Sequence, residues 1–141
     1  KFFHHLSPSN FTIMKRNLLL IFLALFLSTS LCAQVTVDVV APKEFVKAQK
    51  KKKKNVILDV RTPQEYAAGH LEDAVLLDWR DNVKFMQEVE NYDKSKTYYI
   101  YCRSGRRSNS AAKYMKSKGF KVYDMQGGIN NWCGQGLKVV K

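Results

Sequence analysis

Cysteine is scarce in this chain of 141 residues, which contains only Cys32, Cys102 and Cys133. Three cysteines are too few for a scaffold held together by disulfides. No two of them form a Cys-x-x-Cys pair, so thioredoxin-like redox chemistry is poorly supported. Histidine is equally scarce, and His70 with Cys102 and Cys133 would be a thin ligand set for zinc. We therefore expect no metal site, and the thiols need another explanation.

The chain also lacks an apolar run long enough to cross a bilayer. Residues 18–27 are apolar throughout, but they are about ten residues, roughly half of the ~20 that a transmembrane helix needs. Lys15 and Arg16 precede this run and small polar residues follow it, which is typical of a secretory signal peptide. We therefore predict a leader over residues 1–33, translated from Met14, no permanent membrane span, and a periplasmic or secreted protein.

The end of the predicted leader leaves two cleavage points open, after Cys32 or after Ala33, because both residues are small. A lipid anchor on Cys32 is the weaker alternative, since Leu31 is bulkier than the small residues that bacterial lipoprotein signals carry there. Residues 34–141 have the length of one small globular domain with its own core. We expect this domain to be a monomer with one active site.

Acidic residues are few, so the formal net charge is +12, and it falls to +9 once the predicted leader is removed. Five of those charges belong to one lysine run, Lys50, Lys51, Lys52, Lys53 and Lys54. The rest of the domain is only mildly basic, which argues against a nucleic-acid-binding protein. We interpret the lysine run as the solvated end of a helix. Binding to an anionic surface or to an acidic partner protein is the alternative.

Strand-like and helix-like segments alternate beyond the leader, which is typical of an α/β fold with a central, mostly parallel sheet and helices on both faces. The expected strands are residues 35–40, 56–60, 74–77, 98–101 and 121–125. The expected helices begin at Glu44, Thr62, Asn82, Ser108 and Ile129. In the second helix, Thr62 as N-cap, Pro63 at the first position and Glu65 have the pattern of a capping box. The third, over residues 82–92, would turn Val83, Phe85, Met86, Val89 and Tyr92 inward.

Cys102 stands at the carboxyl end of a predicted strand, where open α/β sheets place their ligand sites. Successive backbone N–H groups in a loop that leads into a helix favour a thiolate over a thiol. Such cysteines have pKa values of roughly 3.5–7.5 instead of about 8.5, so Cys102 would need no separate general base. A buried structural thiol is the alternative, and the basic loop that follows argues against it.

The candidates for substrate binding follow Cys102 directly. They are Arg103, Ser104, Gly105, Arg106, Arg107 and Ser108. The three arginines offer charge and directed donors to an oxyanion such as a thiosulfonate, and the glycine lets the backbone approach it closely. Some of these arginines could instead point into solvent.

Three motifs, in the same order along residues 55–137, resemble those of a rhodanese domain. They are Asp59-Val60-Arg61-Thr62-Pro63-Gln64-Glu65-Tyr66 with Gly69-His70, the six residues 102–107, and Gly127-Gly128-Ile129 with Trp132. The resemblance implies double displacement: the Cys102 thiolate takes a sulfur from a thiosulfate-like donor, holds it as a persulfide and passes it to a thiol or cyanide. It implies neither a metal nor an organic cofactor.

The resemblance also implies structural roles for residues outside the loop. These residues are Asp59, Arg61, Glu65, His70, Gly127, Gly128 and Trp132. We expect Trp132 in the core, with its indole N–H on an acceptor. The motif does not require Cys133, which is either a bystander or a thiol that resolves the Cys102 persulfide.

Two other functions stay open. The loop of a cysteine phosphatase or arsenate reductase resembles a cysteine, five residues and an arginine, but Ser108 stands at that arginine position. The loop is therefore one residue short, and a tetrahedral phosphate has less room. The other possibility is a rhodanese-like binding module or persulfide carrier that serves a partner protein. Inactive modules resemble copies that have lost the cysteine, and this chain keeps it.

Overall fold

The computed structural model describes residues 15, 17 and 34–141. The chain divides into two compact units, Lys1–Gln34 and Val35–Lys141. The predictions for Met14, the cleavage point and Cys32 lie outside the described residues and stay predictions. No helix in the described part of the chain is long and apolar enough to cross a membrane.

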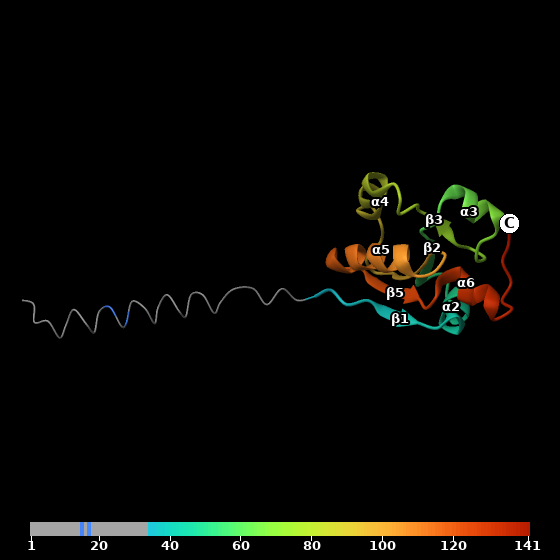
Figure 1. Ribbon diagram of the computed structural model, residues 1–141, viewed down its shortest axis with the longest axis horizontal. Helices are drawn as coiled ribbons and strands as arrows, with labels where there is room; N and C mark the ends of the chain where they lie inside the picture. The colour runs from blue at the N-terminus through green and yellow to red at the C-terminus, as the bar shows by residue number, and fades with distance from the viewer. Residues whose placement is uncertain (1–14, 16, 18–33) are drawn as a thin grey trace, which may run out of the picture. The chain divides into compact units, whose positions relative to one another are not determined.

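The second unit is built on a five-stranded sheet in which all neighbouring strands run parallel. The strands are β1 (Asp38–Val40), β2 (Asn55–Asp59), β3 (Val75–Leu76), β4 (Thr97–Tyr101) and β5 (Lys121–Met125). Their spatial order is β1-β5-β4-β2-β3 (Figure 1). β4 therefore lies in the middle of the sheet, which suits a strand of aromatic and apolar residues buried on both faces.

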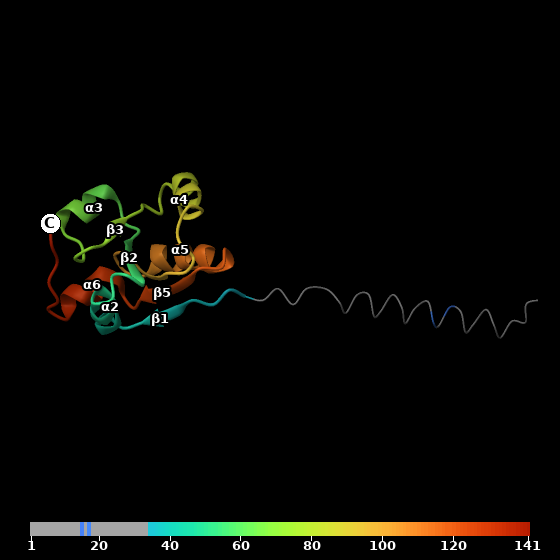
Figure 2. The same cartoon turned by 180° about the vertical axis from the view of Figure 1, so that it is seen from behind.

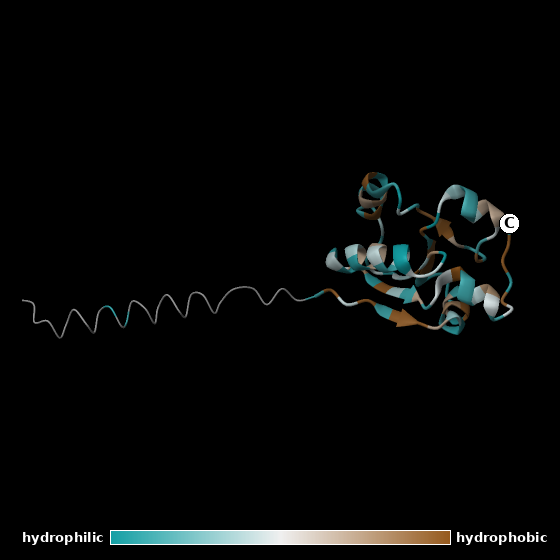
Figure 3. Ribbon diagram, viewed as in Figure 1, coloured by the Kyte–Doolittle hydropathy of each residue, from teal (hydrophilic) through white to brown (hydrophobic). Residues whose placement is uncertain are grey.

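Helices cover both faces of the sheet, as predicted. The helices α2 (Pro42–Gln49), α3 (Pro63–Ala68) and α6 (Gly128–Gly134) pack on one face, and α4 (Asn82–Val89) and α5 (Arg106–Ser117) pack on the other (Figures 1 and 2). Each layer has its own hydrophobic cluster. Alternation along β4 sends Ile100 into the cluster with α4 and α5, and Tyr101 into the cluster with α2 and α6. In Figure 3, β1 and β3 are largely brown, whereas the surface of α5 is largely teal and white.

Two elements are shorter than predicted. β1 is an edge strand that pairs only with β5, over three residues, so the predicted strand 35–40 is reduced to its last half. α4 ends at Val89, not at residue 92. Val83 and Met86 were wrongly expected to face inward and are 69% and 37% exposed. Val83 lies on the opposite side of the helix from buried Phe85 and Val89.

Other boundaries follow local chemistry. The capping box of α3 is confirmed: Thr62 Oγ1 accepts from the Glu65 N–H at 3.3 Å, and Glu65 Oε2 accepts from the Thr62 N–H at 3.1 Å. The lysine run lies in exposed turns directly after α2, so it follows the end of a helix as predicted, and this position leaves the binding alternative open. α5 begins at Arg106, two residues before its predicted start, because Gly105 takes the N-cap position with a φ of 101°.

A buried ionic network links the first motif to β4. Asp59 accepts hydrogen bonds from the Arg61 guanidinium, at 2.6 Å from Nη2, and from the Tyr101 hydroxyl, also at 2.6 Å. Arg61 Nη2 also donates to the carbonyl oxygen of Gly69 at 2.7 Å. Burial, followed by the charge of Asp59, raises the pKa of Tyr101, so the phenol keeps its proton and donates. The network fixes the end of β4, one residue before Cys102.

We predict that Asp59→Asn lowers the free energy of unfolding by about 3–5 kcal/mol, because it leaves the Arg61 charge buried without its partner. Urea denaturation measures this loss. The exposed Glu72→Gln is the control, and its effect should stay within about 0.5 kcal/mol. Equal losses in the two variants would contradict a structural role for the network.

Candidate active site

Cys102 follows the last residue of β4 and begins the loop that leads into α5. The loop turns at Gly105, whose φ of 101° is a conformation that side-chain-bearing residues rarely adopt. α5 starts at the next residue, so its first-turn N–H groups lie at the loop. The positive end of the α5 dipole lies on the same side of the sulfur as these N–H groups and adds to their attraction for a negative charge.

Hydrogen-bond donors surround the Cys102 sulfur. The Gly105 N–H donates to Sγ at 3.1 Å, and the Ser108 hydroxyl lies 3.4 Å from it. Burial alone would raise the pKa of Cys102, but the Ser108 hydroxyl and the N–H groups of Ser108, Ser104 and Gly105 outweigh it, so the pKa lies below its ordinary value. The loop therefore stabilises the thiolate, as the sequence predicts.

Cys102 is nevertheless a buried residue, with 1% of its surface exposed. It contributes to the hydrophobic cluster beneath α4 and α5. The residues that follow it, Arg103 and Ser104, are exposed, and so is Arg106. The thiol therefore lies beneath the loop, and the side chains of the loop separate it from solvent.

The start of α6 holds the carbonyl groups of the loop. The N–H of Ile129 donates to the Cys102 carbonyl at 2.9 Å, and the N–H of Asn130 donates to the Arg103 carbonyl at 3.1 Å. These two carbonyl oxygens therefore accept hydrogen bonds from α6, which holds them in that direction. Gly128 makes the approach possible, because a Cβ there would collide with the backbone of Cys102 and Arg103. This contact explains the third motif physically.

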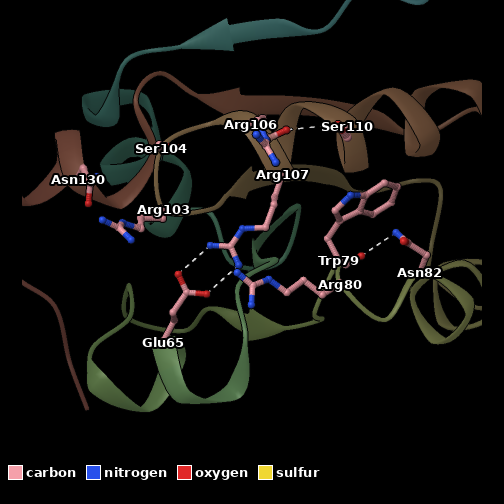
Figure 4. A pocket seen from close by; sticks show the side chains of 10 residues that line it. All are labelled: Glu65, Trp79, Arg80, Asn82, Arg103, Ser104, Arg106, Arg107, Ser110 and Asn130. Carbon is pink, nitrogen blue, oxygen red and sulfur yellow. Dashed lines mark hydrogen bonds and ion pairs between the residues drawn. The ribbon is translucent and has the colours of Figure 1, made fainter.

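An open pocket of about 730 Å³ lies over the loop (Figure 4). Its lining comes from six elements or loops, and comprises Glu65, Trp79, Arg80, Asn82, Arg103, Ser104, Arg106, Arg107, Ser110 and Asn130. Among the described residues, Arg80, Arg103 and Arg106 have no carboxylate partner. The pocket is therefore positively charged and suits an anionic substrate.

Glu65 and Arg107 form an ion pair across this pocket. Two guanidinium nitrogens of Arg107 donate to the two carboxylate oxygens of Glu65, each at 2.7 Å, as the dashed lines in Figure 4 show. The hydrogen bonds from Arg107 are the main reason that the pKa of Glu65 is lowered to about 2. Arg107 was predicted to bind substrate, and here its charge is matched by Glu65. The pair joins the N-terminus of α3 to the first turn of α5.

The comparison with known families agrees with this geometry. Residues 41–135 match the family model described as rhodanese-like domain. The chain belongs to the rhodanese-like family. The putative sulfurtransferase YtwF of Bacillus subtilis is 37% identical over 79 residues, which are 56% of this chain and 74% of that protein. The thiosulfate sulfurtransferase GlpE of Pseudomonas entomophila is 38% identical over 78 residues, 55% of this chain and 69% of that protein.

Solved structures show the same fold. A rhodanese-like domain protein from Staphylococcus aureus has a TM-score of 0.63 and 26% identity, over 74% of this chain and all of that one. Some other relatives are longer, and this chain spans 25% of their length. The solved structure thus shows the rhodanese-like fold, and the family match and the relatives show the relation to sulfurtransferases.

The other residues of the rhodanese-like motifs lie away from the sulfur. Trp132 is buried, and its indole N–H donates to the Lys138 carbonyl at 2.9 Å, as expected. His70 stacks on the ring of Tyr66 at 3.7 Å, and its backbone pairs with Val140. These contacts hold α3, α6 and the C-terminal segment together. Cys133 is exposed on α6 and is a free thiol.

Several residues of the rhodanese-like site were not predicted from the sequence. Trp79 and Arg80 follow β3, and their place after a strand end is the signal that could have found them. Asn82 and Asn130 line the pocket from α4 and α6 and gave no such signal. Asp124 of β5 was missed too: burial raises its pKa to about 6, against weaker opposing contacts with Ser108 and Asn109.

The first prediction for this site concerns Ser108, whose hydroxyl group lowers the pKa of Cys102. We expect Ser108→Ala to raise that pKa, so the midpoint of a pH profile of Cys102 alkylation moves upward. Ser110→Ala is the matched control, since the Ser110 hydroxyl donates to the Arg106 carbonyl and not to the sulfur. An unchanged midpoint in Ser108→Ala would show that this hydroxyl does not act on the thiolate.

The second prediction concerns Glu65. Its folded-state pKa of about 2 is below the ordinary value of 4.5, so its stabilisation is present above about pH 4.5 and is lost as the pH falls toward 2. We expect Glu65→Gln to cost about 1–2 kcal/mol at pH 7, after allowance for solvent screening of this partly exposed pair, and much less near pH 2. Urea unfolding at both pH values measures this.

Glu88→Gln is the control for Glu65, because Glu88 pairs with Lys84 at 3.6 Å on an exposed face of α4. It should cost less than about 0.5 kcal/mol at either pH. A cost in Glu65→Gln that did not diminish in acid would exclude the ion pair as its cause.

Proposed function

We propose that this protein is a single-domain sulfurtransferase of the rhodanese type, which moves a sulfane sulfur from a thiosulfate-like anion to a thiol or cyanide. The observation that carries the proposal is the set of N–H and hydroxyl donors directed at the Cys102 sulfur. A thiolate stabilised in this way is a nucleophile at neutral pH without a neighbouring base. His70 contacts Tyr66 and the C-terminal segment, so it is not needed for activation.

The proposed reaction consists of two successive displacements. The Cys102 thiolate attacks the outer sulfur of the donor, a new S–S bond forms, and the donor's S–S bond breaks. Sulfite leaves with the electron pair, and Cys102 becomes a persulfide. The acceptor then attacks the outer sulfur of the persulfide and regenerates the thiolate. Neither step needs a metal, an organic cofactor or an external oxidant.

The loop supports both steps. The N–H groups that stabilise the thiolate also stabilise the terminal sulfur anion of the persulfide. The unpaired guanidinium groups of Arg80, Arg103 and Arg106 attract the sulfonate end of the donor and the sulfite that leaves. Since Cys102 is buried, the donor has to enter the loop through its exposed side, which is formed by Arg103, Ser104 and Arg106.

The proposal includes export and a monomeric state. The support for export is the sequence pattern of residues 1–33 alone. In the periplasm or outside the cell, the sulfur donor would be a small soluble anion and the acceptor a thiol or cyanide. No nucleic acid takes part.

Two alternatives make different predictions. A phosphatase or arsenate reductase would need a guanidinium at position 108, and the buried Ser108 hydroxyl lies on the sulfur there instead. A persulfide carrier that serves one partner protein would show the first displacement but turn over slowly with small acceptors. The two displacements therefore have to be measured separately.

We predict that incubation with thiosulfate adds one sulfur atom to the intact protein. Intact-mass spectrometry detects the addition, which disappears in Cys102→Ser and persists in Cys133→Ser. Steady-state rates with thiosulfate and cyanide should give the parallel lines of a ping-pong mechanism. Turnover of a phosphate ester together with no sulfur gain would overturn the proposal in favour of a phosphatase.

The same experiment decides the role of Cys133. As a bystander, Cys133→Ser leaves the lifetime of the persulfide unchanged. As a resolving thiol, it takes the sulfur from Cys102, and its replacement lengthens that lifetime.

A further inference from the structure

The lysine run takes no part in the proposed reaction, and it is distant in the sequence from the Cys102 loop. Its residues occupy the turns between α2 and β2, and those at 50–54 are all exposed. In a parallel sheet, the turn before a strand lies at the opposite end from the loop after a strand. The lysine run therefore lies at the amino end of the strands, and Cys102 lies at the carboxyl end.

Other lysines gather at the same end of the sheet. Asn55, Thr97 and Lys121 are register partners on β2, β4 and β5, so the residues before them lie side by side. The Lys54 carbonyl also accepts a hydrogen bond from the Thr97 N–H at 2.9 Å. The resulting basic edge comprises the lysine run, Lys94, Lys96, Lys118 and Lys121.

Carboxylates at the basic edge are too few to neutralise it. Asp73 is engaged by Lys52 in an ion pair. Asp93 accepts hydrogen bonds from Ser95, and these lower its pKa, so it stays ionised. Glu72 and Glu90 are exposed, and each is close in sequence to one of these two aspartates. The nine lysines still outnumber these four carboxylates by five charges.

Three of these lysines lie over aromatic rings, and the five of the lysine run are exposed, with Lys52 paired to Asp73. Lys94 lies 5.4 Å from the ring centre of Phe120, Lys118 lies 5.5 Å from that of Tyr114, and Lys121 lies 5.9 Å from that of Tyr123. Such contacts hold the ammonium groups of α5, β5 and the turn before β4 near the protein surface. The edge presents charge without exposed aromatic anchors that could specify one protein partner.

We propose that the basic edge docks the domain on an anionic phospholipid surface, with the Cys102 loop facing away from it. Lysine side chains are flexible, so an exposed group of them attracts a charged surface without needing a complementary shape. The edge is at the opposite end of the sheet from the pocket, so docking leaves the site open to soluble donors and acceptors.

The make-up of the basic edge favours a membrane over an acidic protein, because its described residues offer lysines and no exposed aromatic side chain. β1 begins at the same end of the sheet, since Asp38 pairs with Tyr123, two residues after Lys121. Asp38, the carboxylate that β1 brings to this end, is paired with Lys116 and does not offset the charge of the edge. An excess of lysine charge without an aromatic anchor suits a surface of many anionic headgroups better than a single protein interface.

The proposal is tested by sedimentation with vesicles of phosphatidylcholine, with and without 30 mole per cent phosphatidylglycerol, a chosen composition on the order of a biological anionic fraction. Both the full chain and residues 34–141 are used, because the two hydrophobic clusters of the domain lie entirely within the shorter segment. We expect both forms to prefer the anionic vesicles, and the preference of the shorter form to vanish at high salt.

Two variants with the same loss of charge separate location from net charge. The first replaces the five lysines of the lysine run by Gln. The second replaces five lysines elsewhere, namely Lys43, Lys84, Lys113, Lys138 and Lys141. We expect the first to weaken binding of residues 34–141 to anionic vesicles by at least about tenfold, and the second by about twofold or less.

Equal losses in the two variants, or no preference for phosphatidylglycerol, would overturn the proposal. Binding to poly-glutamate but not to vesicles would assign the edge to an acidic protein instead. Sulfur uptake from thiosulfate is measured on the same samples. Because the lysines are outside the pocket, both variants should keep it, so a failure of docking is distinguishable from a failure of the catalytic proposal.

Discussion

The orientation of a few peptide groups around one sulfur atom is the constraint on which the site depends. Two carbonyl groups of the Cys102 loop accept hydrogen bonds from the start of α6, and the Gly105 N–H donates to the sulfur. If the carbonyls of Cys102 and Arg103 were free to turn inward, they would repel a thiolate. The absence of a side chain at Gly128 lets α6 come close enough to prevent this. A glycine at the start of α6 thus helps to hold the loop around a cysteine that follows β4.

Much of the fold could be predicted because local and tertiary preferences agree. The buried strands β2, β4 and β5 were found within one residue of their bounds, since apolar runs bounded by turns have few other uses in an α/β chain. The start of α5 was placed two residues late. A glycine at 105 permits a positive φ, but the sequence alone does not show that the chain adopts it there and begins α5 at the next residue.

The candidate site was only partly predictable, for a similar reason. Cys102 and the residues after it are contiguous, so one segment revealed them. Trp79, Asn82 and Asn130 come from separate elements, and only the packing of those elements brings them to the pocket. The pairing of Glu65 with Arg107 joins residues 42 positions apart, and sequence analysis had given them unrelated roles. Charge neutralisation of this kind cannot be read from a loop alone.

The burial of Cys102 also limits which molecules can reach a sulfur atom that is stored on it. A sulfur atom bound there would be enclosed by the loop on one side and by the cluster beneath α4 and α5 on the other. Bulky oxidants and unrelated thiols would then be kept away by size, whatever their reactivity. A stored sulfur atom would therefore be reached only by donors and acceptors small enough to enter from the exposed side of the loop.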